Sequence, residues 1–389
     1  MTLKYDICVV GGAGHVGSVL SIIFASKGQK VLIYDINTKA METIASGKLP
    51  FIDNGYESYL SKALADGNLF FTNKSDDVAN AKTIVLTIGT SVDEFRSPRI
   101  HDVIRCIDDL PITNDHLLIL RSTIYPGVSE YVQRYLKDKG INPLIAFCPE
   151  RIVQGNATEE IQKLPQIVSG ITKEAETKAA NLFRIITDKI VYMSTMEAEF
   201  AKLFANTYRY IQFAATNQFY EMATSAGLDY QKILNGMKYD YPRLRDLPSP
   251  GFAAGSCLYK DSLQLCAFYQ GKFSLGEAAV DANEGLPAFL VSQLEKEFDL
   301  TTKVVGLLGM AFKADSDDAR TSLSYKLKKL LMFRAKKVLT TDPLVSDPNL
   351  SPLDKVIESS DIVIVCVPHS AYKDLDFQGK KVVNIWQGK

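Results

Sequence analysis

The first 35 residues constrain the fold more than any other part of the chain. An apolar run at residues 5–10 leads into the sequence Gly-Gly-Ala-Gly-His-Val-Gly, and an apolar helical pattern then continues to Gly28. A second apolar run at residues 31–34 ends on Asp35. Glycines at these positions allow a tight turn and let the backbone approach a pyrophosphate at the helix N-terminus. This order of strand, turn, helix, strand and acid predicts a parallel βαβ unit that binds a dinucleotide.

The turn and the acid after it supply the first set of expected cofactor contacts. These residues are Gly12, Gly14, His15, Val16, Gly17 and Asp35. A carboxylate at residue 35 would accept hydrogen bonds from the adenosine ribose and would repel a 2′-phosphate. We therefore expect the cofactor to be NAD rather than NADP.

An alternation of strands and helices continues from this unit to about residue 195. Strands are expected at residues 69–72, 83–88, 117–120, 144–147, 166–169 and 190–193. Ligands of a doubly wound sheet meet the carboxyl ends of its strands. Thr90, Thr123 and Glu150 follow such ends, although polar caps are also common there. The pattern predicts an α/β fold with an N-terminal Rossmann-type NAD domain at residues 1–195.

The chain changes to a continuous helical pattern at Met196, and neither Gly nor Pro interrupts it before Gly227. About 30 residues is long for one helix of a globular domain. Its aromatic residues face more than one side, so we expect the helix to join domains or to carry a dimer interface. Lys202 and Asn206 lie four residues apart and share one helix face. We predict a central helical domain at residues 196–298.

Small residues lead up to Cys257, and an apolar helical pattern follows it. The small residues are Gly251, Ala253, Ala254, Gly255 and Ser256. Cys257 is therefore expected at a helix N-terminus, where free N–H groups and the helix dipole stabilise a thiolate. Asp261 lies one helical turn further on the same side. A buried, inert cysteine is the alternative for this position taken alone.

A smaller α/β unit is expected at residues 299–389. Its strands are predicted at residues 303–309, 338–342, 361–367 and 381–385. The segment at residues 313–320 follows the first of these strands, where a ligand would meet the sheet. We therefore expect a second, Rossmann-like domain.

Composition argues against several other classes of protein. The net charge of −1 provides no electrostatic footprint for nucleic acid or an anionic membrane. No apolar run approaches the ~20 residues of a membrane span, and no signal peptide is expected. The six cysteines form no CxxC pairs, which fits a reducing cytoplasm and predicts no metal site. The four histidines lack a catalytic setting, which disfavours a His-based dehydrogenase or hydrolase.

Together these motifs resemble the UDP-glucose/GDP-mannose dehydrogenase family over essentially the whole chain. The matching segments are Gly12 to Gly17, Ser122-Thr123, Pro149-Glu150, Lys202 to Asn206, Ser256-Cys257 with Lys260-Asp261, and Phe312 to Arg320. Within the family, residues 147–152 resemble the branch that acts on UDP-N-acetylmannosamine or UDP-N-acetylglucosamine. The chain departs from the family at Ala254 and Tyr259, and it lacks an arginine near Trp386.

The resemblance implies a four-electron oxidation of a nucleotide sugar at C6, with NAD as the acceptor in each of two hydride transfers. Cys257 would trap the intermediate aldehyde as a thiohemiacetal, and oxidation would convert this adduct into a thioester. Lys202 and Asn206 would stabilise the charge that develops on oxygen, and Lys202 would also be placed for proton transfer.

The same resemblance assigns proton transfer and thioester hydrolysis to Glu150 and Asp261, with Thr123 placing the water. Both carboxylates remain candidates for activating that water. The further cofactor contacts that it implies are Thr90, Thr123, Lys260 and Arg320. The implied substrate contacts are Glu150, Arg151, Ile152, Lys202, Asn206, Arg243, Phe252, Gly255 and Lys313. The implied protein is a cytoplasmic homodimer that binds a UDP-sugar and serves polysaccharide biosynthesis.

Three alternatives remain open. The substrate could be UDP-glucose. A β-hydroxyacid dehydrogenase shares the dinucleotide domain and the Lys-xxx-Asn helix face, but it performs a two-electron oxidation and needs neither the cysteine nor a third domain. A non-catalytic sensor of NAD or nucleotide sugars would keep the fold without needing the reactive residues.

Overall fold

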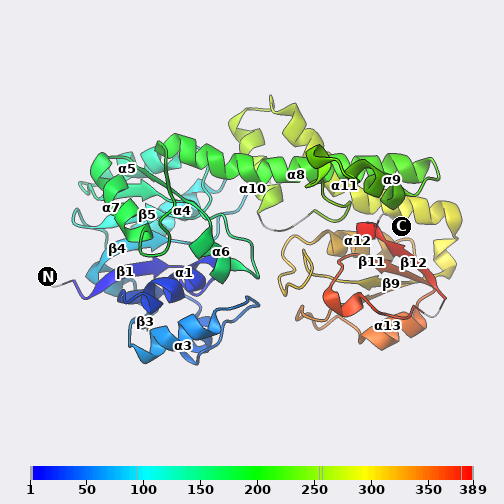
Figure 1. Cartoon of the computed structure of the whole chain (residues 1–389), viewed down its shortest axis with the longest axis horizontal. Helices are drawn as coiled ribbons and strands as arrows, with labels where there is room; N and C mark the ends of the chain where they lie inside the picture. The colour runs from blue at the N-terminus through cyan, green and yellow to red at the C-terminus, as the bar shows by residue number, and fades with distance from the viewer. Residues whose placement is uncertain (1–2, 94, 254, 256, 378, 388–389) are drawn as a thin grey trace. The chain divides into compact units, whose positions relative to one another are not determined.

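The computed structural model describes residues 3–93, 95–253, 255, 257–377 and 379–387 (Figure 1). The chain divides into two compact units, Met1–Phe204 and Ala205–Lys389. Among the helices of the described residues, none is both long enough and apolar enough to cross a membrane.

The first unit is built on an eight-stranded sheet with the order β3-β2-β1-β4-β5-β6-β7-β8. The strands are β1 Tyr5–Val10, β2 Val31–Tyr34, β3 Leu69–Thr72, β4 Ala81–Leu86, β5 Leu117–Leu120, β6 Leu144–Phe147, β7 Gln166–Gly170 and β8 Ile190–Tyr192. Neighbouring strands are parallel except for β6 with β7. The predicted doubly wound sheet is confirmed, and the strand bounds either match the predicted ones or shift by one or two residues.

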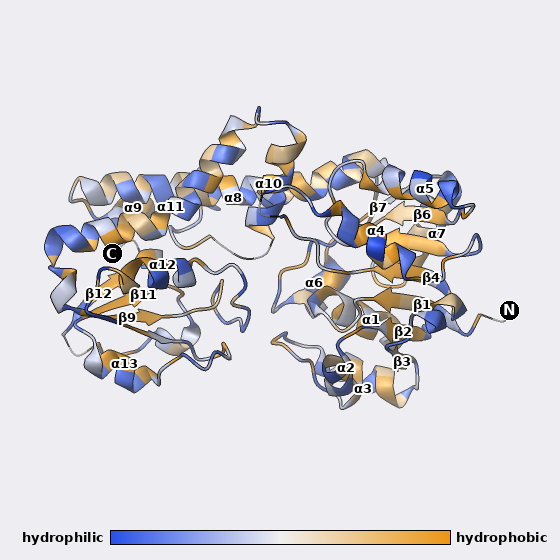
Figure 2. Ribbon diagram, turned by 180° about the vertical axis from the view of Figure 1, so that it is seen from behind, coloured by the Kyte–Doolittle hydropathy of each residue, from blue (hydrophilic) through white to orange (hydrophobic). Residues whose placement is uncertain are grey.

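Helices cover both faces of this sheet (Figure 1). They are α1 His15–Ser26, α2 Thr38–Ala45, α3 Glu57–Ala65, the 3-10 turn Ser75–Asn80, α4 Ile100–Asp108, α5 Val128–Asp138, α6 Ala157–Lys163 and α7 Lys173–Phe183. Strands covered on both faces are apolar on both faces. In β1, Ile7 and Val9 join one core while Cys8 and Val10 join the other. The hydropathy colours of Figure 2 show the same apolar strands inside more polar helices.

The long helix α8 spans Thr195–Ser225, which is 31 residues. Its start is defined by Ser194, whose backbone N–H and hydroxyl each donate to the Glu197 carboxylate at 2.8 Å. This arrangement is a capping box. Gly227, with φ of +72°, follows the end of the helix in the left-handed conformation that commonly terminates helices. The predicted uninterrupted helix is therefore confirmed.

The second unit combines helices with a four-stranded parallel sheet of order β10-β9-β11-β12. The strands are β9 Val304–Leu308, β10 Lys337–Thr341, β11 Ile362–Val365 and β12 Lys381–Asn384. The helices are α9 Tyr230–Lys238, α10 Leu258–Phe268, α11 Ser274–Glu297, α12 Leu323–Met332 and α13 Leu353–Ser359, with 3-10 turns at Pro242–Leu244, Leu300–Thr302, Ser370–Tyr372 and Ile385–Gln387. One core joins Tyr220 of α8, Leu286 of α11 and Leu307 of β9. The predicted second parallel-sheet domain is confirmed.

Candidate active site

The glycine-rich turn connects β1 to α1, and its geometry requires glycine. A side chain at Gly17 would come within 2.4 Å of the Gly11 carbonyl oxygen. The acid at the end of β2 braces the turn, because one oxygen of Asp35 accepts the Ala13 N–H at 2.9 Å. The His15 ring stacks on Phe51 with centroids 4.0 Å apart. The close backbone and the amides at the start of α1, which include Val16, suit a pyrophosphate.

The loops after β4 and β5 are tied to each other at their first residues. The Thr90 hydroxyl donates to the backbone carbonyl of Thr123 at 2.6 Å. The neighbouring Ser122 hydroxyl donates to the carbonyl of Ile88, also at 2.6 Å. These bonds fix the backbone at Thr123, which leads into the loop before α5. Thr90, expected to be a cofactor contact, thus also has a structural partner within the first unit.

Glu150 follows β6 and is held on both carboxylate oxygens. One oxygen accepts the backbone N–H groups of Arg151 and Ile152, at 2.6 and 2.8 Å. The other accepts the guanidinium of Arg121, which is 1% exposed. Arg121 also donates to the Gln166 side chain at 3.0 Å. Glu150 is therefore oriented by a buried ion pair whose partner the sequence analysis missed, although a charge directly after the apolar run 117–120 was a usable signal.

The two residues after Glu150 use their backbones, rather than their side chains, to contact it. The Arg151 guanidinium donates instead to the Pro165 carbonyl. The Ile152 side chain packs against the core of the first unit. Both were expected as substrate contacts, and within the first unit their side chains have these protein partners.

Lys202 and Asn206 lie one turn apart on α8, as predicted. Lys202 is 8% exposed. Its amine forms no hydrogen bond or ion pair that joins it to another residue in the described part of the chain. Asn206 donates its side-chain N–H to Asp261 at 2.6 Å. A nearly buried ammonium without an acidic partner is an arrangement found at functional sites, where a ligand completes the surroundings.

Cys257 is the N-cap residue of α10, so the expected position at a helix start is confirmed. Its side chain is exposed, unlike those of the buried Cys8, Cys148, Cys266 and Cys366. Burial raises the pKa of Cys148 to about 12. Cys257 thus combines an exposed side chain with a position at the start of a helix.

Asp261 lies below the cysteine in the first turn of α10 and is fully buried. Its two oxygens accept from different donors, Asn206 and the Lys260 amine, each at 2.6 Å. Its own N–H donates to the Cys257 carbonyl at 2.9 Å. The carboxylate therefore connects α8 to the first turn of α10 and is held in one orientation.

The loop before Cys257 is held by a buried amide network. The side chain of Asn217 accepts the Gly251 N–H at 2.8 Å and donates to the Gly251 carbonyl at 3.0 Å. Asn217 also donates to Asn283 of α11 at 2.9 Å. The sequence analysis missed Asn217, although it lies eleven residues, or three turns, after Asn206 on α8.

The backbone conformation and the surroundings of Gly255 explain why the motif has a glycine at this position. Gly255 has φ of +100°, and a side chain there would lie 2.6 Å from the Phe312 ring. Only glycine fits this position. Phe252, expected to contact substrate, has its ring in the core of the second unit. Ala254 and Ser256, which also belong to this motif, lie outside the described residues.

The segment after β9 presents Arg320 near the cysteine. Asp318 pairs with Arg320 at 2.6 Å and raises its pKa, with a smaller contribution from Cys257. Arg320 therefore lies within electrostatic reach of the thiol. Lys313, in the same segment, is half-buried. Arg243 is exposed and donates to the Tyr241 hydroxyl at 3.2 Å.

Asp342, at the end of β10, anchors the segment that contains Lys313 and Arg320. Its carboxylate accepts from Met310 and Ala311 N–H at 2.6 and 3.0 Å, and from the His369 ring at 3.1 Å. The other ring nitrogen of His369 accepts the Asp315 N–H at 3.1 Å. The loops after β9, β10 and β11 are thus joined through one buried histidine.

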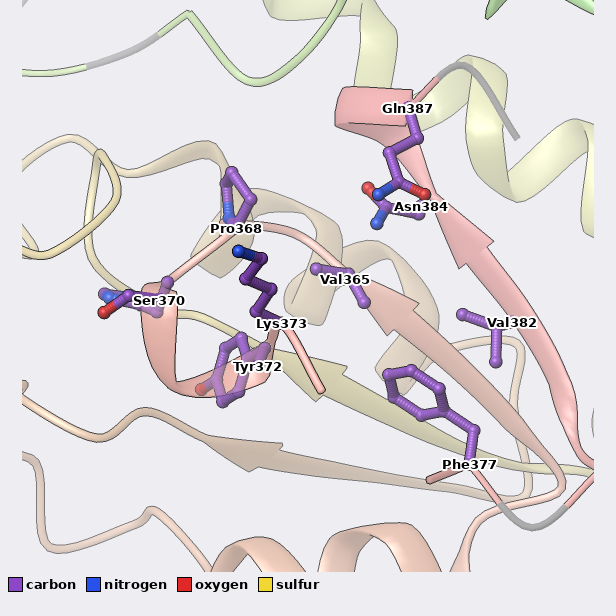
Figure 3. Close-up of a pocket in the computed structure, with 10 residues that line it drawn as sticks. Val365, Pro368, Ser370, Tyr372, Lys373, Phe377, Val382, Asn384 and Gln387 are labelled. Carbon is purple, nitrogen blue, oxygen red and sulfur yellow. The ribbon is translucent and has the colours of Figure 1, made fainter. Parts of the chain in front are cut away.

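A pocket of about 460 Å³ lies beside this anchor, at the carboxyl ends of β11 and β12 (Figure 3). Its wall combines apolar side chains, among them Phe377 and Val382, with the polar Lys373 and Asn384. The described residues that line it include none of the predicted site residues. It is distinct in composition from the cysteine site.

Comparison with known proteins gives consistent matches along the chain. Residues 5–187, 196–285 and 306–385 match the NAD binding, central and UDP binding domains of the UDP-glucose/GDP-mannose dehydrogenase family. The UDP-N-acetyl-D-mannosamine dehydrogenase of Pyrococcus horikoshii is 28% identical over 381 residues, which cover 94% of this chain and 90% of the relative. The UDP-glucose 6-dehydrogenase of Rickettsia bellii is 27% identical over 393 residues, with the same coverage of 94% and 90%. A solved UDP-glucose dehydrogenase from Pyrobaculum islandicum superposes with a TM-score of 0.90 at 25% identity and covers 98% of this chain and 94% of its own.

Proposed function

The chain belongs to the UDP-glucose/GDP-mannose dehydrogenase family of NAD-dependent nucleotide-sugar dehydrogenases, and we propose that it oxidises the C6 alcohol of a UDP-sugar to a carboxylate. The observation that carries this proposal is the exposed Cys257 at the start of α10, above the buried Asp261. A two-electron oxidation of an alcohol requires no thiol. A four-electron oxidation has an aldehyde between its two steps, and a thiolate can hold that aldehyde covalently.

The glycine turn after β1 fits the dinucleotide that the family uses, because the backbone of Gly11 and Gly12 and the Thr87 hydroxyl leave no room for a side chain at Gly17. Asp35 stands at the strand end where a ribose is recognised. NAD, when bound, accepts one hydride in each oxidation. The remaining steps belong to the side chains of this chain.

In the proposed sequence, the C6 hydroxyl loses its proton to a base as its hydride leaves. The sulfur of Cys257 then bonds to the aldehyde carbon, and the carbonyl oxygen takes up a proton to give a thiohemiacetal. Loss of a second hydride and of that proton gives the thioester. Water attacks the thioester carbon, and the carbon–sulfur bond breaks to release the acid and the thiolate. The balance is one alcohol and one water converted to one carboxylic acid, with two hydrides transferred and two protons released, and a third proton is released when the acid ionises.

Lys202 and Asn206 are proposed to stabilise the negative charge on the substrate oxygen in these steps. The ammonium of Lys202 is nearly desolvated, which strengthens its interaction with an anion. Asn206 keeps one side-chain N–H for Asp261 and has a second one available for the oxygen. Asp261 and Glu150 are both proposed for proton transfer. Three donors on Glu150 and two on Asp261 support a fixed orientation of each carboxylate, which general acid–base catalysis requires.

The stoichiometry of NADH tests the proposal directly. Complete conversion of a limiting amount of UDP-sugar should release two NADH per sugar together with the uronic acid. One NADH per sugar with an aldehyde or ketone product would instead support the β-hydroxyacid alternative. Absence of turnover with every UDP- and GDP-sugar, despite NAD binding, would support the sensor alternative.

For the sugar itself we propose UDP-N-acetylmannosamine or UDP-N-acetylglucosamine. The support is the segment Cys148 to Arg151, which resembles this branch, and the loop at residues 241–251, whose prolines limit its own flexibility. Relatives named for UDP-N-acetyl-D-mannosamine and for UDP-glucose match the chain almost equally well. UDP-glucose therefore remains the competing substrate.

The assembly is proposed to be a cytoplasmic homodimer formed through α8. Apolar side chains on this helix are exposed, among them Tyr208, Phe219 and Met222. Exposed apolar side chains on one long helix can pack against the same helix of a second protomer. We also propose the domain limits 1–195 for NAD, 196–298 for the central helices and 299–389 for UDP.

A further inference from the structure

Glu199 is a buried acid that connects two elements of the first unit. It lies on α8, three residues before Lys202, and is 1% exposed. One carboxylate oxygen accepts the Ser129 N–H at 2.9 Å and the Ser129 hydroxyl at 2.6 Å. The other accepts the Gly127 N–H at 2.5 Å. Three donors from one short segment thus converge on one side chain of α8.

The segment that Glu199 holds is the loop between β5 and α5. Gly127 is the N-cap residue of α5, and its φ of +91° turns the chain into the helix. Thr123 lies four residues before Gly127 in the same loop, and Thr90 holds its carbonyl. The loop is therefore fixed at one end by Thr90 and at the other by Glu199. Because Pro126 precedes Gly127, the backbone between these two points has little freedom.

A carboxylate is an unusual choice if the only task is to cap α5. A hydroxyl or amide from the N-cap position would satisfy the same N–H groups without burying a charge. Burial raises the pKa of Glu199, and the hydrogen bonds from Ser129 and Gly127 oppose that effect. The Glu199 side chain reaches from α8 to the start of α5. A capping side chain at the N-cap position of α5 would make no connection to α8.

We propose that Glu199 is a positioning residue for the catalytic step, fixing Lys202 on α8 relative to Thr123 in the β5–α5 loop. This inference rests on the proposed function, since it assumes that Lys202 and Thr123 act on the same reaction. Lys202 lies within one helical turn of Glu199. The hydrogen bonds of the Glu199 carboxylate therefore fix the position of this turn of α8 relative to the β5–α5 loop. Loss of the connection frees the loop without removing either reacting side chain.

The substitution Glu199→Gln tests the proposal while keeping the shape of the side chain. A glutamine offers one acceptor oxygen, so its NH₂ group must face an N–H of Gly127 or Ser129. The expected result is a fall in kcat of at least about 10-fold, as for other misplaced catalytic groups. The dissociation constant for NAD should change less than kcat does, because Thr123 is only one of the expected cofactor contacts and the glycine turn between β1 and α1 is untouched. Turnover is counted per NAD-binding site measured by calorimetry, which removes unfolded protein from the comparison.

The matched control is Glu197→Gln, on the same helix two residues earlier. Glu197 bonds to Ser194 at the start of α8 and is exposed, so this variant should lose some thermal stability and keep its kcat. Glu199→Asp keeps the charge but shortens the reach, and it should show an intermediate kcat. If Glu199→Gln does not fold, the kcat of Glu199→Asp is compared with those of the wild type and of Glu197→Gln instead.

The outcomes separate this proposal from the proposed function. A kcat per site within twofold of wild type for Glu199→Gln, or an equal loss for Glu197→Gln, would overturn the positioning role and leave a purely structural one. The NADH-to-sugar ratio reports the four-electron chemistry independently. That ratio should stay at two in the slower Glu199→Gln variant, because Cys257 is unchanged.

Discussion

The surroundings of each cysteine determine which thiol can react. Cys8, Cys148 and Cys366 lie inside strands or directly after them, and burial raises their pKa. Cys257 lies at the start of α10 with its side chain exposed. The sequence predicted the helix start at Cys257, because small residues before a cysteine and an apolar pattern after it are local signals. The Arg121–Glu150 pair was not predicted, because its members follow different strands and no sequence spacing relates them.

The substitution Cys257→Ala should abolish formation of the acid. The aldehyde would have no covalent partner, while the dinucleotide turn of the first unit is untouched. The dissociation constant for NAD, measured by calorimetry, should therefore stay within about twofold of wild type. Cys106→Ala on α4 is the control and should keep full activity. Wild-type turnover in Cys257→Ala would exclude the covalent mechanism.

Asp35 leads to a prediction about the choice of cofactor. The wild-type protein should prefer NAD to NADP in kcat/KM by at least about 10-fold, equivalent to about 1.4 kcal/mol. Asp35→Asn removes the charge that repels a 2′-phosphate and keeps an oxygen for the Ala13 N–H. In this variant the ratio of kcat/KM for NAD to that for NADP should be smaller than in the wild type. Equal use of both cofactors by the wild type would show that Asp35 does not face the ribose.

At the scale of elements, the connections between strands and helices were predictable and the contacts between distant helices were not. The continuous α8 follows from a stretch without Gly or Pro between residues 196 and 226. The network of Asn217, Gly251 and Asn283 joins α8, a loop and α11, and it depends on packing that no local pattern encodes. Asn217 was visible only as a polar residue sharing the face of Asn206.

The exposed face of α8 predicts an effect on assembly. Met222 is 63% exposed there, and Met222→Glu would place a charge where we propose that a second copy packs. The variant should be monomeric at micromolar concentration by light scattering, whereas the wild type should be a dimer or a multiple of one. Phe333→Glu, at the exposed end of α12, is the control and should not change the assembly. A compact wild-type monomer would contradict the prediction.

The stability that Asp342 provides, by joining the loops after β9, β10 and β11, should depend on pH. Burial opposes its ionisation, but hydrogen bonds from His369 and from backbone N–H groups outweigh burial and lower its pKa to about 2. Its folded pKa lies below the unfolded value, so its stabilisation is present above about pH 4 and is lost as the pH falls toward 2. The full contribution is roughly 2 kcal/mol.

Urea unfolding of wild type and Asp342→Asn checks this coupling. The gap in unfolding free energy should be largest near neutral pH and should narrow by about 1 kcal/mol between pH 5 and pH 3. Asp354→Asn, an exposed acid on α13, should show no comparable change. A gap that stays constant over this range would mean that Asp342 does not ionise with a lowered pKa.

At the scale of the whole molecule, the proposed catalytic residues come from both units. Thr123, Glu150 and Lys202 belong to the first, while Asn206, Cys257 and Asp261 belong to the second. Each was proposed from a short local motif: a strand end for Thr123 and Glu150, a helix face for Lys202 and Asn206, and a helix start for Cys257 and Asp261. The choice of sugar is different, because it depends on how side chains from several segments together shape one surface.

A panel of UDP- and GDP-sugars tests the proposed choice. UDP-N-acetylmannosamine or UDP-N-acetylglucosamine should exceed UDP-glucose in kcat/KM by at least about 100-fold. A site that bonds to an acetamido group leaves its polar groups unpaired when a hydroxyl replaces it. If UDP-glucose or GDP-mannose is the best substrate, the branch is wrong, and the four-electron mechanism is unaffected.

Each of the two sheets has an acid directly after its second strand in chain order, and the two acids differ in what surrounds them. Asp35 accepts from the Ala13 and Asn37 N–H groups and remains half-exposed. Asp342 is enclosed by backbone N–H groups and by His369. In evolutionary terms, selection at residue 35 would act through cofactor use, so a lineage could change it when its metabolism changes. Selection at residue 342 would act through folding, and that position should tolerate almost no replacement in any lineage, whatever sugar it oxidises.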